Sequence, residues 1–348
     1  MTKGLMKKHV VMIALAAALL SAPPVMLHAA DGPKPLKVFI LAGQSNMEGQ
    51  GVIKMDPARN EGKGTLEFLV KNPATADRFK HLVDAKGAWV VRDDVWIWYL
   101  GRKPPAGGPP AVPQGGGGLT VGYGAKAGLI GPELQFGHLM GDYFENQVLL
   151  IKLAWGGKSL AKDFRPPSSG GEVGPFYTEV VKQTKEVLAN LKANFPDYDG
   201  RGYELAGFGW HQGWNDGCSP VQAAEYEKNM ANFIRDIRKD LGAKDLPFVI
   251  ANSGFGGRDQ KIDRRLQVMN GQAAVAGYEE FKKTVACVET RDFFRPAEVS
   301  PTRQGYHWNG NAETYFLIGD GLGKAMVEIL KGRSSQAVSS AAAAAPSK

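Results

Sequence analysis

The sequence predicts an α/β domain in which a parallel sheet of five strands is covered by helices on both faces. Short apolar runs rich in β-branched and aromatic residues alternate with longer stretches that carry apolar residues at helical spacing. Strands and helices that alternate in this way form parallel sheets with connecting helices on each face. A mature chain of about 300 residues suits two average domains, but one α/β domain with an insertion fits equally well.

The expected strands are short apolar runs, which is typical of strands buried on both faces. They are Val38–Ala42, Val148–Leu153, Leu205–Trp210, Phe248–Ala251 and Val285–Glu289. Helices are expected at Tyr177–Phe195, at Val221–Leu241 after a Ser219-Pro220 start, and at Glu313–Leu330.

Between Asp56 and Ile130 the alternation fails, and we interpret residues 56–130 as an inserted lobe. Its Pro/Gly-rich stretch Lys103–Gly118 is typical of a mobile segment. The preceding stretch Asp94–Tyr99 alternates like a strand. Its aromatic side chains either offer a stacking surface for ligand rings or pack an accessory hairpin, and the sequence leaves both open.

The two ends are expected to lie outside the domain, which spans residues 31–332. Three lysines precede the apolar run Val10–Leu20, and a small-residue stretch ends at Ala30, so residues 1–30 are typical of a cleaved secretory signal peptide. The apolar run is short for a membrane span. We therefore expect a periplasmic or secreted protein with no membrane segment after cleavage, and a disordered Ser/Ala-rich tail over residues 333–348.

Composition excludes several classes of partner. Cleavage removes three lysines and no acids, which lowers the formal charge from +7 by three, to +4. Without a concentrated basic stripe this balance predicts no nucleic-acid partner. The two cysteines, Cys218 and Cys287, have no second Cys or His at chelating spacing, so no metal site is expected. An oxidising compartment permits their disulfide without requiring it, and the oligomeric state is not indicated.

Polar loops follow three of the expected strands. They are Gly43-Gln44-Ser45-Asn46, Gly156-Gly157-Lys158-Ser159 and His211-Gln212-Gly213-Trp214-Asn215-Asp216. Ligands of parallel sheets bind beyond the carboxyl ends of the strands. The three loops are therefore expected to form one site.

Ser45 and His307 are the candidate nucleophile and base. A serine hydroxyl needs a base to take its proton, and Ser45 lies just past a strand. Taken alone, this serine is more simply explained as a helix N-cap. His307 lies after the last strand and before the last helix, so it should face the same edge as Ser45. His81 and His138 are expected to be structural or at the surface.

The remaining candidates would bind the oxyanion or the substrate. The Gly156 amide and the Asn215 side-chain amide lie at strand ends, where together with the Ser45 amide they would form an oxyanion hole. Turn formation alone also explains each of them. Gln44, His211 and Gln212 are the expected substrate contacts, with a buried structural histidine as the alternative for His211.

These blocks resemble the SGNH hydrolases. The resemblance rests on Gly43-Gln44-Ser45-Asn46-Met47, Ala154-Trp155-Gly156-Gly157, Gly213-Trp214-Asn215-Asp216 and the late His307, and it runs from about Leu36 to Lys331. Within that superfamily the chain is most similar to the sialate O-acetylesterases and carbohydrate esterase family 6.

The resemblance implies a flavodoxin-like, three-layer α/β/α domain. It also implies Ser45 as nucleophile, Gly156 and Asn215 as oxyanion donors, His307 as base, and no metal or organic cofactor. The implied substrate is an acetylated carbohydrate, either a sialic acid or a polysaccharide.

Two positions depart from the family pattern, because both of the usual acids are absent. Many members have an aspartate three residues before the histidine, where this chain has Gln304, and related esterases have a glutamate where it has Trp214. A glutamine carbonyl can accept the imidazole Nδ1 proton but supplies no charge. Orientation by Gln304 or a backbone carbonyl, and a displaced acid at Asp216, Asp292 or Glu313, remain open.

Three alternative functions are therefore considered, in decreasing order of preference. The first is an exported serine O-acetylesterase acting on carbohydrate. The second is a catalytically silent carbohydrate-binding protein of the same fold, which the missing acid motivates. The third, a lipase or thioesterase, requires an apolar acyl channel that the polar loops do not indicate.

Overall fold

The computed structural model describes Met1, residues 34–101 and residues 115–343, with side chains as far as residue 333. The described residues from Lys34 onward form one compact unit. The predicted signal peptide and most of the Pro/Gly-rich stretch lie outside the described residues.

A seven-stranded sheet with the order β4-β3-β6-β1-β7-β8-β9 forms the centre of this unit. All five predicted strands are present, and the expected strand count is two too low. Only β4 is antiparallel to its neighbour in this sheet. The strands are β1 Leu36–Gly43, β3 Arg92–Tyr99, β4 Gly115–Leu119, β6 Val148–Ala154, β7 Tyr203–His211, β8 Phe248–Ala251 and β9 Val285–Val288. A separate small sheet pairs β2 Gly51–Val52 with β5 Leu129–Ile130.

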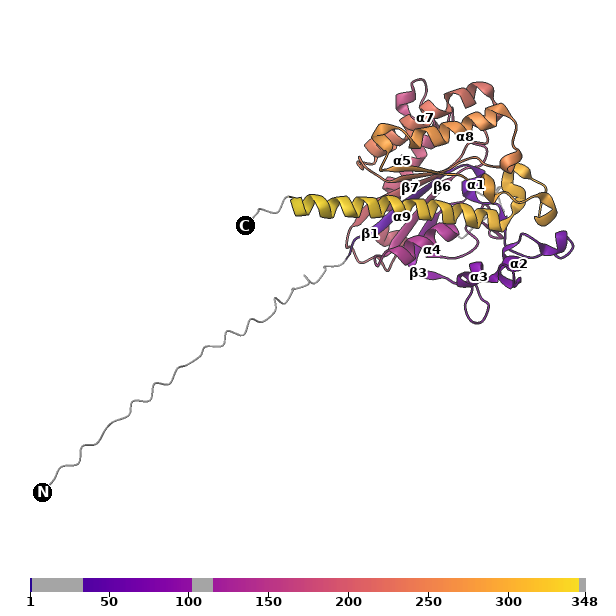
Figure 1. Cartoon of the computed structure of the whole chain (residues 1–348). Coiled ribbons are helices and arrows are strands. Elements are labelled where there is room, and N and C mark those ends of the chain that lie inside the picture. The colour runs from indigo at the N-terminus through magenta and orange to yellow at the C-terminus, as the bar shows by residue number, and fades with distance from the viewer. Residues whose placement is uncertain (2–33, 102–114, 344–348) are drawn as a thin grey trace. The chain divides into compact units, whose positions relative to one another are not determined.

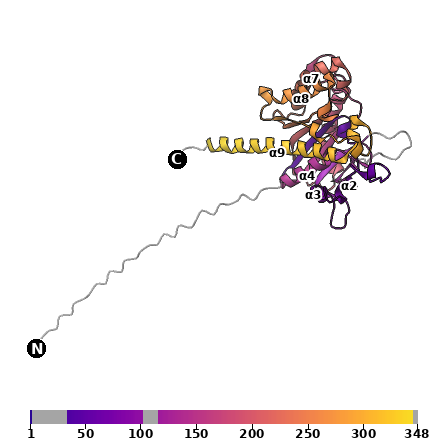
Figure 2. The same ribbon diagram turned by 45° about the vertical axis from the view of Figure 1, so that its right-hand side comes forward.

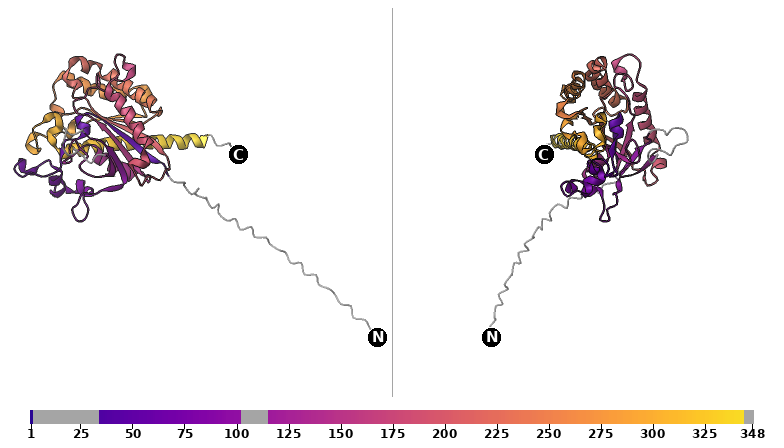
Figure 3. Two further views of the ribbon diagram at one scale, coloured as in Figure 1. Left: turned by 180° about the vertical axis from the view of Figure 1, so that it is seen from behind. Right: turned by 90° about the vertical axis from the view of Figure 1, so that its right-hand side faces the viewer.

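Helices cover both faces, which gives the predicted three-layer α/β/α architecture. Helices α5, α7 and α8 lie on one side of the sheet and α4 and α9 on the other (Figures 1 and 2), and Figure 3 shows the strands between the two helical layers. The helices are α1 Ser45–Glu48, α2 Leu66–Lys71, α3 Ala76–Phe79, α4 Glu133–Tyr143, α5 Pro175–Ala189, α6 Leu191–Asn194, α7 Pro220–Asp240, α8 Asp263–Ala276 and α9 Ala312–Ala343.

The alternation of side chains along β1 builds the two cores. Val38 and Ile40 join the apolar cluster formed with α5, α7 and α8, whereas Phe39 and Leu41 join the cluster formed with α4 and α9. All four side chains are fully buried. Each contributes about 1.5–3 kcal/mol on burial, which is why a continuous apolar run suits this central strand.

The predicted lobe is partly an extension of the sheet. The aromatic stretch after Asp93 forms β3, where Trp96 stacks on Phe195 at 4.9 Å with 7° between the rings and Tyr99 is buried. Packing of a hairpin, rather than a free stacking surface, therefore accounts for these aromatics. The α2 and α3 segments pack against α4 and α9 through a small apolar cluster that includes Phe79 and Phe316.

The last helix continues beyond its predicted end. Helix α9 runs to Ala343, whereas the predicted helix ended at Leu330. Alanine has the highest helix propensity, so the Ala-rich end extends a helix already anchored in the core. Residues 344–348 lie outside the described part.

The cysteines do not pair. Cys218 is exposed, Cys287 is partly buried, and both are free thiols. Within the described ranges, no helix is long and apolar enough to cross a membrane.

Candidate active site

The register of three neighbouring strands brings the predicted loops together. Gly43 at the end of β1 lies opposite Ala154 of β6 on one side and His211 of β7 on the other. The loops that leave these strands therefore begin at the same level of the sheet edge, as the sequence predicted.

Gly43 makes the sharp exit from β1 possible. A Cβ at this position would lie 2.2 Å from the His211 carbonyl oxygen, and its φ is +155°. The chain then turns at Gln44, whose amide donates to the same carbonyl at 3.3 Å. A larger residue at position 43 would push the nucleophile loop away from β7.

Ser45 is the first residue of α1 and not its N-cap. The N-cap is Gln44, and no side chain caps this helix. The Ser45 side chain lies at the end of β1 and is 6% exposed, and among the described residues its hydroxyl takes part in no hydrogen bond. The N-cap explanation for this serine therefore does not hold.

The Gln44 side chain ties the first and third loops together. Its Oε1 accepts hydrogen bonds from Gln212 Nε2 at 3.2 Å, the Gly213 amide at 3.1 Å and the Asn215 amide at 3.4 Å. Gln44 is 1% and Gln212 2% exposed. In this structure the two predicted substrate contacts bind protein atoms, so we interpret them as residues that position the loops.

The candidate oxyanion donors lie in adjacent loops. The Trp155 amide donates to the Gly43 carbonyl at 3.1 Å, which places Gly156 next to the Ser45 turn. Asn215 Nδ2 donates to the Gly157 carbonyl at 2.5 Å. This bond fixes the orientation of the Asn215 amide and leaves its second N–H available.

His307 lies in the 3₁₀ segment η9, Gly305–Gly310, whose backbone is strained. Trp308 and Asn309 have φ values of +52° and +55°. A left-handed bulky residue costs on the order of 1–3 kcal/mol and persists only when its surroundings fix it. Here Trp308 is fully buried, and Asn309 Nδ2 donates to the Arg295 carbonyl at 3.0 Å.

Asn46 and Tyr315 connect this loop to the nucleophile turn. Asn46 Nδ2 donates to the Tyr306 carbonyl at 3.0 Å, and the Tyr315 hydroxyl donates to Asn46 Oδ1 at 2.7 Å. The same hydroxyl lies 3.2 Å from the His307 carbonyl. The residues that flank Ser45 and His307 are thus joined by direct hydrogen bonds, although they are separated by most of the sequence.

Gln304 is a neighbour of the imidazole. Its Oε1 lies 3.4 Å from His307 Nδ1, a long hydrogen-bonding distance, and its backbone carbonyl accepts the His307 amide at 2.8 Å. Gln304, one of the orienting groups that the sequence left open, therefore lies beside the His307 imidazole.

The three candidate acids have other partners. The Asp216 carboxylate accepts from the Leu160 and Ala161 amides and from Gln212 Nε2, and burial raises the pKa of Asp216 to about 6. Glu313 pairs with Arg78 at 2.9 Å and with Arg295 at 2.8 Å. Asp292 pairs with Arg258 at 2.7 Å. Each carboxylate is thus used in holding other segments of the chain.

His211 is a buried structural residue. Its Nδ1 lies 3.1 Å from the Ala251 carbonyl and must carry the proton, because a carbonyl only accepts. Its Nε2 is buried and has no hydrogen-bond partner among the described residues. Burial lowers the pKa of His211 to about 4, so the ring is neutral at pH 7. The alternative that the sequence left open for His211 fits this environment.

A buried ion pair below the nucleophile was not recognised in the sequence. Lys152 Nζ donates to the Glu48 carbonyl at 2.7 Å, the Tyr123 carbonyl at 2.6 Å and Glu133 Oε2 at 2.7 Å. The side chains of Lys152 and Glu133 are 0% and 1% exposed. Since Glu48 ends α1, Lys152 anchors the nucleophile helix. A lysine inside an otherwise apolar strand was the available signal.

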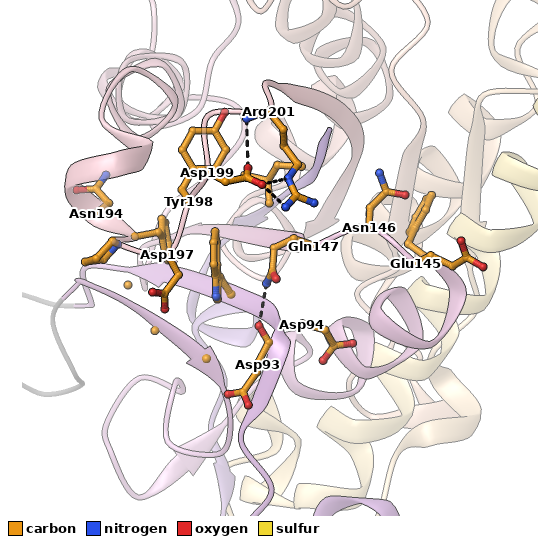
Figure 4. Close-up of a pocket in the computed structure, with 18 residues that line it drawn as sticks. Asp93, Asp94, Glu145, Asn146, Gln147, Asn194, Asp197, Tyr198, Asp199 and Arg201 are labelled. Carbon is orange, nitrogen blue, oxygen red and sulfur yellow. Dashed lines mark hydrogen bonds and ion pairs between the residues drawn. The ribbon is translucent and has the colours of Figure 1, made fainter. Parts of the chain in front are cut away.

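A large hollow lies at the opposite end of the sheet. It has a volume of about 680 Å³ and extends between Leu36 at the start of β1 and Tyr198. Figure 4 shows acidic and amide side chains around it, including Asp93, Gln147 and Asp199. No serine or histidine lines it, so the hollow is separate from the chemistry at the carboxyl edge.

The arrangement defines a class of protein. A serine at the start of a short helix after β1, a histidine before the last helix, and candidate amide donors after β6 and β7 lie where the resemblance to the SGNH hydrolases places them. Among the described residues, no group of three or more His, Cys, Asp or Glu side chains is placed to hold a metal ion.

Residues 35–327 match the family described as carbohydrate esterase, sialic acid-specific acetylesterase. The chain belongs to this family and is a carboxylic ester hydrolase. No curated protein matches it.

Three solved structures share the fold. One is NanS, with 14% identity, 87% of this chain and 99% of that chain covered, and a TM-score of 0.53. A protein from Arabidopsis thaliana is 18% identical, and the match covers 84% of this chain and 98% of that chain with a TM-score of 0.51. A carbohydrate acetylesterase from Xanthomonas citri is 15% identical, and the match covers 85% of this chain and 56% of that chain, also with a TM-score of 0.51. At these identities the likeness supports the architecture alone.

Proposed function

We propose that this protein is an exported serine esterase that removes O-acetyl groups from carbohydrate. The observation that carries the proposal is the hydrogen-bonded connection of the Ser45 turn to the His307 loop through Asn46 and Tyr315. The family match supports an acetylated carbohydrate as the substrate, for which we propose a sialic acid or a polysaccharide. Export rests on the signal-peptide pattern of residues 1–30.

In the first half-reaction Ser45 Oγ attacks the acetyl carbonyl carbon, and His307 takes the hydroxyl proton. The amides of Ser45 and Gly156 and the second N–H of Asn215 Nδ2 stabilise the oxyanion. When the tetrahedral intermediate collapses, the C–O bond to the sugar breaks, and His307 returns its proton to the sugar oxygen. Acetyl-Ser45 remains.

In the second half-reaction water attacks acetyl-Ser45 while His307 again acts as base. Acetate leaves, and the proton returns to Ser45. Throughout, the Gln304 carbonyl holds the Nδ1 proton and so selects the tautomer whose Nε2 faces the nucleophile. Gln304 adds no negative charge, and an ester tolerates this loss better than an amide because its leaving group needs less protonation.

The test is acetate release by Ser45→Ala and wild type from acetylated polysaccharides and O-acetyl sialic acids, together with labelling by a fluorophosphonate. We expect Ser45→Ala to lose both turnover and labelling while its melting temperature stays near that of wild type. Ser168→Ala, a serine on an exposed 3₁₀ turn outside the candidate site, serves as the matched control. Retained turnover in Ser45→Ala would remove Ser45 from the mechanism.

The same experiment addresses the silent carbohydrate-binding protein that the missing acid motivates. A chain with no turnover on any acetyl ester and no phosphonate labelling, but with saturable binding of the sugars, would establish that alternative. Comparison of acetyl with octanoyl esters separates the O-acetylesterase from a lipase or thioesterase.

A further inference from the structure

Arg265 is an arginine without an anionic partner beside the candidate site. It lies in the first turn of α8, where its backbone amide donates to the Ile262 carbonyl at 2.9 Å. Within the described ranges its side chain forms no ion pair and no hydrogen bond. Its Nε is buried and unpartnered. By contrast, Arg258 lies nearby in the chain and pairs with Asp292 at 2.7 Å.

Aromatic rings hold the Arg265 side chain in place. Its guanidinium carbon lies 4.2 Å from the centre of the Trp214 ring and 5.8 Å from that of Phe255. Gly217 leaves room for the stem, since a Cβ there would lie 3.3 Å from Arg265 Cγ. Stacking attracts the charge to the ring but leaves the in-plane N–H donors unsatisfied.

The stacked pair is continuous with the catalytic loop. The Trp214 ring lies 5.4 Å from that of Tyr306, and the Tyr306 ring lies 4.5 Å from the His307 imidazole. Tyr306 is 41% exposed, and Trp214 directly precedes the oxyanion candidate Asn215. A line of aromatic rings thus leads from the candidate base to an unpaired guanidinium.

The local charges favour an anion at Arg265. Burial lowers the pKa of Arg265, and the neighbouring Arg264 lowers it further, while the Cys218 thiol acts in the opposite direction. No carboxylate is among the groups that shift the pKa of Arg265. The guanidinium is therefore a half-buried cation whose planar set of donors matches a carboxylate in two parallel hydrogen bonds.

We propose that Arg265 binds the carboxylate of an acidic sugar, a sialic acid or a hexuronate, while the acetyl group of that sugar or of its neighbour lies at Ser45. Trp214 and Tyr306 then contact the sugar between the two ends. Arg265 is in this view a specificity-determining residue, and the inference rests on the proposed esterase function for the position of the acetyl group.

The test compares kcat/KM of wild type, Arg265→Gln and Arg265→Lys on three kinds of ester. These are O-acetyl sialic acid, acetylated oligomers that contain hexuronate, and esters without a carboxylate, namely acetylated xylo-oligosaccharide and 4-nitrophenyl acetate. We expect Arg265→Gln to lose on the order of 10- to 100-fold on at least one acidic substrate, the range for a hydrogen bond to a charged group. The neutral esters should change by less than about 2-fold.

Two variants sharpen the result. Arg265→Lys keeps the charge but not the planar donors, so it should recover only part of the lost rate. Arg258→Gln makes the same charge change at an ion-paired arginine and should leave all substrates unaffected. Equal losses on acidic and neutral esters, or no loss on either acidic substrate, would overturn the assignment to Arg265.

A binding measurement keeps this inference separate from the esterase proposal. Titration of the full mature chain with unacetylated sialic acid and with glucuronate, followed by calorimetry, needs no turnover. Weaker binding of one of these to Arg265→Gln supports the carboxylate subsite even if the chain hydrolyses no ester. Unchanged binding of both by Arg265→Gln would contradict it.

Discussion

Replacing Lys152 by methionine should destabilise the fold more than any surface charge change. Methionine has nearly the same length but removes the ammonium, so Glu133 would be left 1% exposed with backbone amides, such as that of Gly131, as donors and no positive charge beside it. The Glu48 and Tyr123 carbonyls would lose their donor too. Breaking a buried pair on one side costs about 3–5 kcal/mol, because the remaining charge is uncompensated.

The assay is urea unfolding followed by tryptophan fluorescence, with kcat on a small acetyl ester measured where the variant remains folded. Lys152→Met should lose about 3–5 kcal/mol of unfolding free energy. It should also lose kcat beyond what the folded fraction explains, since Glu48 ends the nucleophile helix. Lys182→Met breaks an exposed pair on α5 and should cost under about 1 kcal/mol.

The double variant Lys152→Met/Glu133→Gln decides whether the pair is the cause. The glutamine introduced in place of Glu133 keeps an acceptor for the Gly131 amide and carries no charge, so much of the lost stability should return. The coupling free energy between the two sites should be about 1–3 kcal/mol. A loss below about 1 kcal/mol in Lys152→Met, or strict additivity in the double variant, would refute the reasoning.

Three further outcomes are expected. Since burial lowers the pKa of His211 to about 4, unfolding takes up a proton at this residue between pH 6.5 and 4. The free energy of unfolding should therefore decrease by up to about 3 kcal/mol as the pH is lowered through that window. In urea titrations at a series of pH values, His211→Gln should show a smaller decrease. Gln304→Ala should lower kcat by about 10-fold and Gln304→Glu should raise it, whereas an unchanged rate in both would exclude this residue as the orienting group. Only Cys218 should react with a thiol reagent in the native chain, because burial raises the pKa of Cys287 to about 12, and both should react after unfolding.

The sequence predicted β1, β6, β7, β8 and β9 because each is a short, mainly apolar run, which is typical of a buried strand. Lys152 interrupts the run in β6, and in β9 only Val285 is buried. The sequence did not predict β4, because Gly115–Leu119 has almost no side chains from which to read a pattern. Nor did it predict α4, in which Gln135 and His138 are buried along with the apolar residues, so that no polar stripe marks the outer face.

The positions of the candidate site residues were predictable to the level of the loop. Strand order and parallel direction place Ser45, Gly156 and Asn215 at one edge without any knowledge of side-chain contacts. What the pattern did not reveal is which polar residues hold the loops and which face the substrate. Gln44 and Gln212 carry the right chemistry for binding, and only their burial shows that they bind each other.

The candidate site combines a rigid frame with a weakly supported base. Lys152 anchors the end of α1, Gln44 ties the candidate nucleophile and oxyanion loops together, and Tyr315 joins the candidate nucleophile loop to the His307 loop. Because these bonds are buried, they fix the reacting groups before substrate arrives, which is where most of the catalytic advantage of a serine hydrolase lies. A carboxylate at position 304 would add charge to the imidazole but would not add to that frame. In the proposed mechanism, catalysis would therefore depend first on the fixed geometry around Ser45 and only then on the strength of the His307 base.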